Sequence, residues 1–262
     1  MRQRIDIQRE IAWHDRRIRD LEGELVRMRL EENERQMDKT IQGKAKLVRL
    51  LGFSGRIHSG KTSAAKHTIA RLRAKGHKVA EINFADRLKE LVLELFVPVE
   101  WDWILSDLEK NKGMVLPCGM TVRQTLQWFG TDVCREEWQD VWVNAWRRRV
   151  QEAEEGGVDY VIVSDVRFPN ELKAIQDMSG KVIRFLRAPH LDDQHESEIA
   201  LDEIEIGSLR TVFQDTQRYV RIAVPREGIQ EPHFGALIDN TNMSLDEKNK
   251  AVWKLVKERK WI

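Results

Sequence analysis

The feature that most constrains this chain is a phosphate-binding loop directly behind an apolar segment. Residues 48–54 (VRLLGFS) are typical of a buried strand, and residues 55–62 (GRIHSGKT) fit G-x-x-x-x-G-K-[ST] at every fixed position. Residues 63–75 then have apolar side chains at near-helical spacing and stop at Gly76. A glycine-rich surface turn could match by chance, but the flanking strand and helix argue against it. The pattern predicts an anion site made by backbone N–H groups and a helix N-terminus.

We expect this loop to hold the phosphates of ATP together with Mg²⁺. The Lys61 ammonium would reach the β- and γ-phosphates, and the Thr62 hydroxyl would ligate the metal. The residues predicted to bind the nucleotide are Gly55, His58, Ser59, Gly60, Lys61, Thr62 and Ser63.

From residue 47 onward, strand and helix patterns alternate with short connections. This order predicts an α/β fold, a P-loop NTPase-type parallel sheet covered by helices. Further strands are expected at 78–84, 158–164, 181–186 and 236–239, and further helices at 86–96, 121–129, 135–155, 170–178 and 245–260. The polar stretch 98–120 is interpreted as a loop or lid. Within 204–232, an amphipathic piece at 212–224 is assigned to no element.

Three tryptophans recur at four-residue spacing in the expected helix 135–155. Because this spacing places them on one helix face, Trp138 and Trp146 are predicted to pack into the core.

Charged residues follow several of the expected strands or begin the expected helices. Ligands bind at the carboxyl ends of the strands in an open α/β sheet, where the loop and Asp165 would both lie. Asp165 is predicted to bind Mg²⁺ directly or through water. The basic residues expected to converge on transferring phosphates are Lys89, Arg123, Arg167 and Arg187.

The overall charge indicates that any anion site is local. The 262 residues include 44 Lys and Arg against 43 Asp and Glu, so no global field attracts nucleic acid or an anionic membrane. No apolar run approaches the roughly 18 residues of a membrane span. Cys118 and Cys134 have no zinc-type or pairing spacing. We expect a soluble, cytoplasmic protein with no membrane partner.

Residues 1–46 differ from the rest of the chain. They contain 12 Lys and Arg, 10 Asp and Glu and no proline, a composition that builds no core of its own. An a/d seam of about three heptads is formed by Ile7, Ile11, His14, Ile18, Leu21, Leu25 and Met28. Two interpretations stay open: a coiled coil that makes a homodimer or docks a partner, and a solvated helix. The domains expected are a charged helix at 1–46, which could form a short coiled coil, and a P-loop domain at 47–262 with a lid or insertion at 98–120.

Further residue groups follow the loop in a defined order. They are Phe84-Ala85-Asp86-Arg87-Leu88-Lys89, Val122-Arg123 with Leu126-Gln127, Gly130-Thr131-Asp132, Trp142, Asp165-Val166-Arg167 with Glu171, Arg187, His195-Glu196-Ser197-Glu198 and Ile238-Asp239-Asn240. Across about residues 47–258 the chain therefore resembles the phage-type deoxynucleoside monophosphate kinase family. The resemblance implies a nucleoside monophosphate kinase-like α/β fold that transfers the γ-phosphate of ATP to a deoxynucleoside 5′-monophosphate, for deoxynucleotide supply.

The resemblance also implies an acceptor site. Lys89 and Arg123 would hold the acceptor phosphate, residues 130–132 would shape the pocket, and Trp142 would line it or stack on the base or sugar. The residues implied to bind the acceptor are Lys89, Arg123, Gly130, Thr131, Asp132, Trp142, Asp165, Arg167 and Glu171.

At the reacting phosphates, the resemblance implies that Asp165 and Arg167 bind acceptor or Mg²⁺, supported by Glu171. The residues implied to be catalytic are Lys61, Arg123, Asp165, Arg167 and Arg187, and a segment with His195 and Glu198 would close over the site. Such a site suits phosphoryl transfer, which needs positioning and charge neutralisation more than a strong base.

Two other classes of function compete with this one. A P-loop ATPase could act as a switch in a nucleic-acid-related assembly that docks through residues 1–46. A binding protein could retain ATP without chemistry, although the intact Lys61, Thr62 and Asp165 argue against that.

Overall fold

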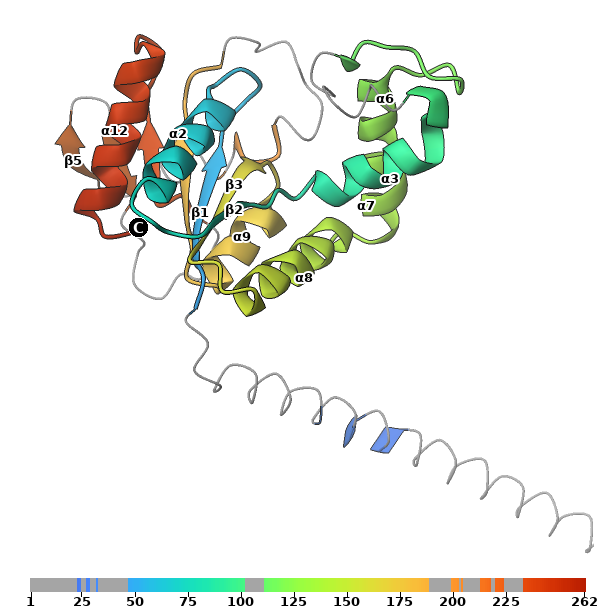
Figure 1. The fold of residues 1–262 in the computed structure, drawn as a ribbon, viewed down its shortest axis with the longest axis horizontal. Coiled ribbons are helices and arrows are strands. Elements are labelled where there is room, and N and C mark those ends of the chain that lie inside the picture. Colours follow the sequence, from blue (N-terminus) through green and yellow to red (C-terminus); the bar gives the residue numbers. More distant parts are fainter. Residues whose placement is uncertain are drawn as a thin grey trace, which may run out of the picture. The chain divides into compact units, whose positions relative to one another are not determined.

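The computed structural model describes residues 23–24, 27–28, 32, 47–101, 111–188, 199–202, 204, 213–217, 220–223 and 233–262 (Figure 1). The chain divides into two units, Met1–Lys46 and Leu47–Ile262. In the first unit, the described residues at 23–24, 27–28 and 32 are helical, and Met28 is exposed. Most of the predicted heptad seam lies outside the described residues, so pairing through it stays a prediction.

The second unit is built on a seven-stranded sheet with the order β2-β3-β1-β4-β7-β6-β5. Its strands are β1 (Arg49–Ser54), β2 (Val79–Glu81), β3 (Tyr160–Val166), β4 (Lys181–Phe185), β5 (Phe213–Gln217), β6 (Val220–Ala223) and β7 (Ala236–Ile238). The first five in the spatial order are parallel, as the sequence predicts. Within the piece at 212–224, which sequence reasoning left unassigned, the described residues form β5 and β6, which pair with each other and with β7 in antiparallel fashion and extend the sheet.

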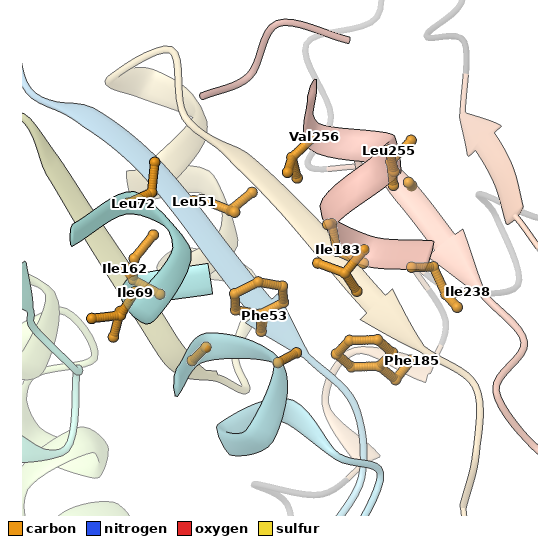
Figure 2. Packing of buried hydrophobic residues seen from close by; sticks show 14 of the residues in the cluster. Leu51, Phe53, Ile69, Leu72, Ile162, Ile183, Phe185, Ile238, Leu255 and Val256 are labelled. Atoms are coloured by element: carbon orange, nitrogen blue, oxygen red, sulfur yellow. The ribbon is translucent and has the colours of Figure 1, made fainter. Parts of the chain in front are cut away.

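Helices cover both faces of the sheet because its central strands alternate two sets of apolar side chains. Leu51 and Phe53 of β1 point to the face covered by α2 (Lys61–Arg73) and α12 (Leu245–Glu258), and the Phe53 ring stacks on Phe185 (Figure 2). Leu50 and its neighbours in register point to the face covered by α8 (Val141–Glu155) and α9 (Pro169–Asp177). Burial on both faces explains the continuous apolar runs of these strands.

A second group of helices lies at one side of the sheet (Figure 1). It comprises α3 (Asp86–Phe96), the short helix η1 (Val99–Trp101), α6 (Val122–Gln127), the π-helical segment η2 (Trp128–Val133) and α7 (Cys134–Glu137). The reciprocal hydrogen bonds of Thr121 and Gln124 form a capping box that begins α6. Of the predicted lid 98–120, residues 102–110 lie outside the described part, and its role stays a prediction.

The prediction of a single helix over 135–155 is wrong, because the structure has two helices there. The chain is extended at Trp138 (φ −147°, ψ 93°), which ends α7, and α8 begins three residues later. Trp138 is 59% exposed and therefore does not pack in the core as predicted, whereas Trp146 is 1% exposed and does. Hydrogen bonds from Asn170 to Gln139 and Asp140 hold the break. A four-residue spacing cannot reveal such a break.

None of the described helices is both long and apolar enough to cross a membrane.

Candidate active site

The parallel strands bring the functional segments to one edge of the sheet. The loop after β1, Arg167 after β3, Arg187 after β4 and Asn240 after β7 all follow carboxyl ends. Ser54 is in register with Val166, and the Ser54 hydroxyl donates to the Val166 carbonyl at 2.9 Å. Asp165 therefore lies beside the start of the phosphate loop, as the sequence predicts from strand order.

The loop has the conformation that its glycines allow. Gly55 has φ +141° and Gly60 has φ +97°. A Cβ on Gly55 would come within 2.6 Å of the Ser59 hydroxyl and 2.9 Å of the Phe185 carbonyl oxygen. Only glycine fits there without a rearrangement. The Ser59 hydroxyl is buried and has no hydrogen-bond partner among the described residues.

The two residues that end the motif lie at the N-terminus of α2. Lys61 Nζ donates to the carbonyl oxygens of Gly55 (2.6 Å) and Arg56 (2.8 Å). Thr62 is exposed at the first turn of the helix. The loop, the buried Ser59 hydroxyl and the helix N-terminus together suit a polyphosphate, which would draw the Lys61 ammonium to its oxygens.

Two residues that the sequence-based site lacked hold the loop from behind. Asn240 Nδ2 donates to the Ser59 carbonyl at 2.8 Å, and Asn240 Oδ1 accepts from the Arg187 backbone N–H at 3.1 Å. Lys248 Nζ donates to the Gly60 carbonyl at 2.6 Å and to the Ser63 hydroxyl. Burial, together with Arg187, lowers the pKa of Lys248 to about 8. The sequence did contain a signal for Lys248, because this lysine lies on the apolar, buried face of α12 together with Val252 and Leu255.

Asp165 is held by the loop between β2 and α3. Its two carboxylate oxygens accept from the backbone N–H groups of Phe84 (3.0 Å) and Ala85 (2.9 Å). Among the residues that the structure describes, no group of three or more His, Cys, Asp or Glu side chains is arranged to bind a metal. Thr62 and Asp165, the residues predicted to hold Mg²⁺, carry the kind of oxygen donors that the ion takes from a protein, and it typically completes its shell with phosphate oxygens and water. The metal role of both residues stays a prediction.

Glu171 and Arg135 join the start of α9 to α7. Glu171 is 2% exposed; one carboxylate oxygen accepts from Arg135, and the other accepts from the backbone N–H groups of Arg167 (2.8 Å) and Phe168 (3.1 Å). The Arg135 guanidinium also lies 3.9 Å from the centre of the Phe168 ring. Burial raises the pKa of Glu171 to about 7, although Arg135 opposes the shift. Sequence reasoning missed Arg135, because nothing in the local pattern separates it from solvated arginines.

The predicted pocket segment 130–132 lies in η2 and is held from two sides. The buried Trp142 indole N–H donates to the Gly130 carbonyl at 2.9 Å. On the other side, a Cβ on Gly130 would come within 2.5 Å of Leu88 Cδ2 on α3. Trp142 is 3% exposed, so the protein encloses the indole that was predicted to line the pocket or stack on the acceptor. Thr131 is half-buried and Asp132 is exposed.

Lys89 lies in a different environment from the other predicted acceptor residues. Its ammonium is 4.0 Å from an Asp86 oxygen, and the residue is among those that line an open cavity of about 550 Å³. The cavity is lined by Glu81, Ile82, Asp86, Lys89, Glu90, Arg149, Glu152 and Ala153. This set contains none of the other residues predicted to bind the acceptor, so a phosphate-binding role for Lys89 stays a prediction.

The remaining predicted residues lie at element ends. Arg123 is half-buried in the first turn of α6, where its backbone N–H donates to the Lys112 carbonyl at 3.0 Å. Arg167 is half-buried after β3, and Arg187 is exposed after β4. His195 and Glu198 lie outside the described residues.

This fold and site define a P-loop nucleotide-binding protein of the α/β class. The family model for deoxynucleotide monophosphate kinase matches residues 104–208. The chain is 31% identical over 169 residues to a protein of Acanthamoeba polyphaga mimivirus named "Putative deoxynucleotide monophosphate kinase", an alignment that covers 60% of this chain and 83% of the relative. The chain belongs to the deoxynucleotide monophosphate kinase family, which makes it a phosphotransferase of the nucleotide kinase type.

Solved structures give weaker similarities. Dephospho-CoA kinase from Campylobacter jejuni is 16% identical, with a TM-score of 0.36 over 80% of this chain and 96% of that one. The structure of APE1195 is 13% identical, with a TM-score of 0.35 over 81% and 96%.

Proposed function

We propose that this protein transfers the γ-phosphoryl group of ATP to the phosphate of a deoxynucleoside 5′-monophosphate. An acceptor phosphate oxygen attacks the γ-phosphorus, the bond from that phosphorus to the β,γ-bridging oxygen breaks, and ADP leaves. The products are ADP and a deoxynucleoside diphosphate. The transferred group carries negative charge on three oxygens, so neutralisation and alignment supply most of the catalysis.

One observation supports this reaction above others. The phosphate loop follows β1, and the segment Asp165–Glu171 begins at the carboxyl end of β3; these two strands are neighbours in register. A donor held by the loop therefore lies beside the segment expected to hold the acceptor. Two substrates held at adjoining strand ends react as if within one molecule, which lowers the barrier by several kcal/mol, on the order of 7 or more for ideal alignment.

The donor half of the proposed site is the P-loop with its supports. Backbone N–H groups and Lys61 would bind the β- and γ-phosphates of ATP, and Arg187 would approach the transferring group. Mg²⁺, held by Thr62 and Asp165, would neutralise and orient the phosphates when it is bound.

The acceptor half would be formed by Arg123, Arg167 and the η2 segment 130–132. The Glu171 carboxylate accepts from the backbone N–H of Arg167 and also pairs with Arg135. It would therefore fix the backbone position from which the Arg167 side chain extends. Trp142 would hold the η2 segment in place through its hydrogen bond to the Gly130 carbonyl. These residues would fix the monophosphate without themselves moving a proton.

The test is a panel of the four deoxynucleoside and four ribonucleoside monophosphates, each incubated with ATP and Mg²⁺, with ADP formation measured. We expect ADP formation that requires a deoxynucleoside monophosphate and disappears in Lys61→Ala. ATP turnover that ignores every monophosphate would sink the proposal and favour an ATPase switch. ATP binding without turnover would favour a binding protein.

A further inference from the structure

A chain of charged side chains runs from the core of the sheet to the phosphate loop. It begins at Arg184 of β4, which is 3% exposed and points to the face of the sheet opposite α2. Arg184 Nη1 donates to the Ser54 hydroxyl at 3.2 Å, and Arg184 Nη2 donates to Asp202 Oδ1 at 2.9 Å. A guanidinium this buried requires an anionic partner, because an unpaired buried charge is strongly destabilising.

Asp202 uses its second oxygen on the phosphate loop. Asp202 Oδ2 accepts from the Arg56 guanidinium, whose side chain is only 13% exposed. Asp202 is itself fixed in place, since its neighbour Leu201 is 1% exposed in the core cluster on that face of the sheet. One carboxylate therefore connects an arginine of the core with an arginine of the loop.

The chain of contacts ends at Lys61. The carbonyl of Arg56 accepts from Lys61 Nζ at 2.8 Å and from the Ser59 backbone N–H at 3.1 Å. Anything that fixes the Arg56 side chain also restrains this carbonyl, which together with the Gly55 carbonyl holds the ammonium of Lys61 in the nucleotide-free protein. The loop is thus held on three sides, by Asn240, by Lys248 and by Asp202 through Arg56.

We propose that Asp202 is a positioning residue of the donor site, which aligns Lys61 with the ATP phosphates by fixing Arg56 against Arg184. Asp202 does not touch the nucleotide in this proposal. The role rests on the proposed function in so far as Lys61 is taken to bind the donor phosphates, but the restraint on the loop is a property of the protein without nucleotide.

The first experiment follows hydrogen–deuterium exchange of residues 55–62 in the nucleotide-free protein, in R56Q, D202N and D202E. R56Q removes the contact to the loop and leaves the Arg184–Asp202 pair in place, so it separates the restraint from loss of folding. The control is R147Q, which removes an exposed ion pair with Asp177. We expect faster exchange at 55–62 in R56Q and D202N, near-normal exchange in D202E, and none of these changes in R147Q. Unchanged exchange in R56Q overturns the proposal.

The second experiment measures kinetics with ATP and the acceptor varied separately. R56Q and D202N should each lower kcat/KM for ATP by about tenfold, while KM for the acceptor stays within about twofold. The double variant R56Q/D202N should be no worse than the poorer single variant, because both changes break one chain of contacts. Fully additive losses, or equal effects on both substrates, contradict the proposal. If the wild type phosphorylates no monophosphate, the proposed function fails, whereas the exchange experiment still decides the role of Asp202.

Discussion

Lys248 Nζ lies 2.6 Å from the carbonyl oxygen of Gly60, so the last helix of the chain supports the phosphate loop from behind. A Cβ on Gly60 would come within 2.6 Å of the same ammonium. The glycine of the motif is therefore needed for the approach of Lys248 as well as for its own positive φ. Buried and close to Arg187, the ammonium has a depressed pKa, and negative phosphates bound nearby would favour its charged form.

Lys248→Met should impair the use of ATP without unfolding the protein. Methionine has a similar length and removes a buried charge, so stability should change little, but the Gly60 carbonyl loses a charged hydrogen bond worth about 1.5–3 kcal/mol. We expect kcat/KM for ATP to fall about tenfold or more. Lys250→Met is the matched control, because Lys250 lies on the same helix with its side chain 68% exposed. Equal kinetics in the two variants would contradict the support role.

Lys61→Ala and Arg123→Ala should both slow the reaction, but in different ways. Each removes charge neutralisation worth on the order of 3 kcal/mol, which corresponds to roughly a hundredfold in rate. Loss of Lys61 should damage ATP handling with every acceptor, whereas loss of Arg123 should chiefly raise KM for the monophosphate. The measurement is ATP affinity by calorimetry beside two-substrate kinetics. Equal effects of both variants on ATP affinity would overturn the division into donor and acceptor residues.

The sequence predicts most of the sheet because its signals are local. The apolar runs of β1, β3 and β4 and the loop motif each lie within a few residues, and parallel topology follows from their order. The supports of the site depend on contacts between distant residues. Arg135 meets Glu171 across 36 positions and Lys248 meets Gly60 across 188, so no local pattern contains them.

Trp138 and Trp142 show the same limit in another form. Their four-residue spacing correctly indicated a helical face at Trp142 and Trp146, but the chain breaks at Trp138 and exposes that ring. The break is held by Asn170, from a different helix. Sequence could likewise not reveal that the ring of Trp142 is enclosed and that its N–H group donates to the Gly130 carbonyl.

Glu171→Gln should alter the pH dependence of stability. The pKa of Glu171 is raised from 4.5 to about 7, so the folded state binds this proton more tightly than the unfolded state. The stability from this group is present in full below about pH 4.5 and is lost as the pH rises through about 7. Glutamine does not titrate and lacks this loss. The unfolding free energy of the variant relative to the wild type should therefore rise by up to about 3 kcal/mol between pH 4.5 and 8. Urea unfolding of both proteins at several pH values measures it.

The control for Glu171 is Glu90→Gln. Burial alone would raise the pKa of Glu90, but hydrogen bonds from Arg87 and Arg149 outweigh it and lower the pKa. The stability that Glu90 contributes is lost as the pH falls. As the pH rises, the unfolding free energy relative to the wild type should therefore fall in Glu90→Gln and rise in Glu171→Gln. If the relative unfolding free energy changed in the same direction in both variants, burial would not be what sets the pKa of Glu171.

Trp142→Phe should weaken acceptor binding, and the chain offers a closely matched control in Trp146→Phe. Both indoles are buried on α8 and donate to a backbone carbonyl, Trp142 to Gly130 at 2.9 Å and Trp146 to Ile82 at 3.1 Å. Each substitution leaves a carbonyl without its partner and a small cavity, at a cost of about 1–3 kcal/mol in unfolding free energy. Only Trp142→Phe removes a hydrogen bond to the η2 segment. We therefore expect similar losses of thermal stability, with KM for the monophosphate raised several-fold in Trp142→Phe alone and KM for ATP unchanged in both. A rise in acceptor KM of the same size in Trp146→Phe would show that general loosening of α8, and not the bond to Gly130, shapes the acceptor pocket.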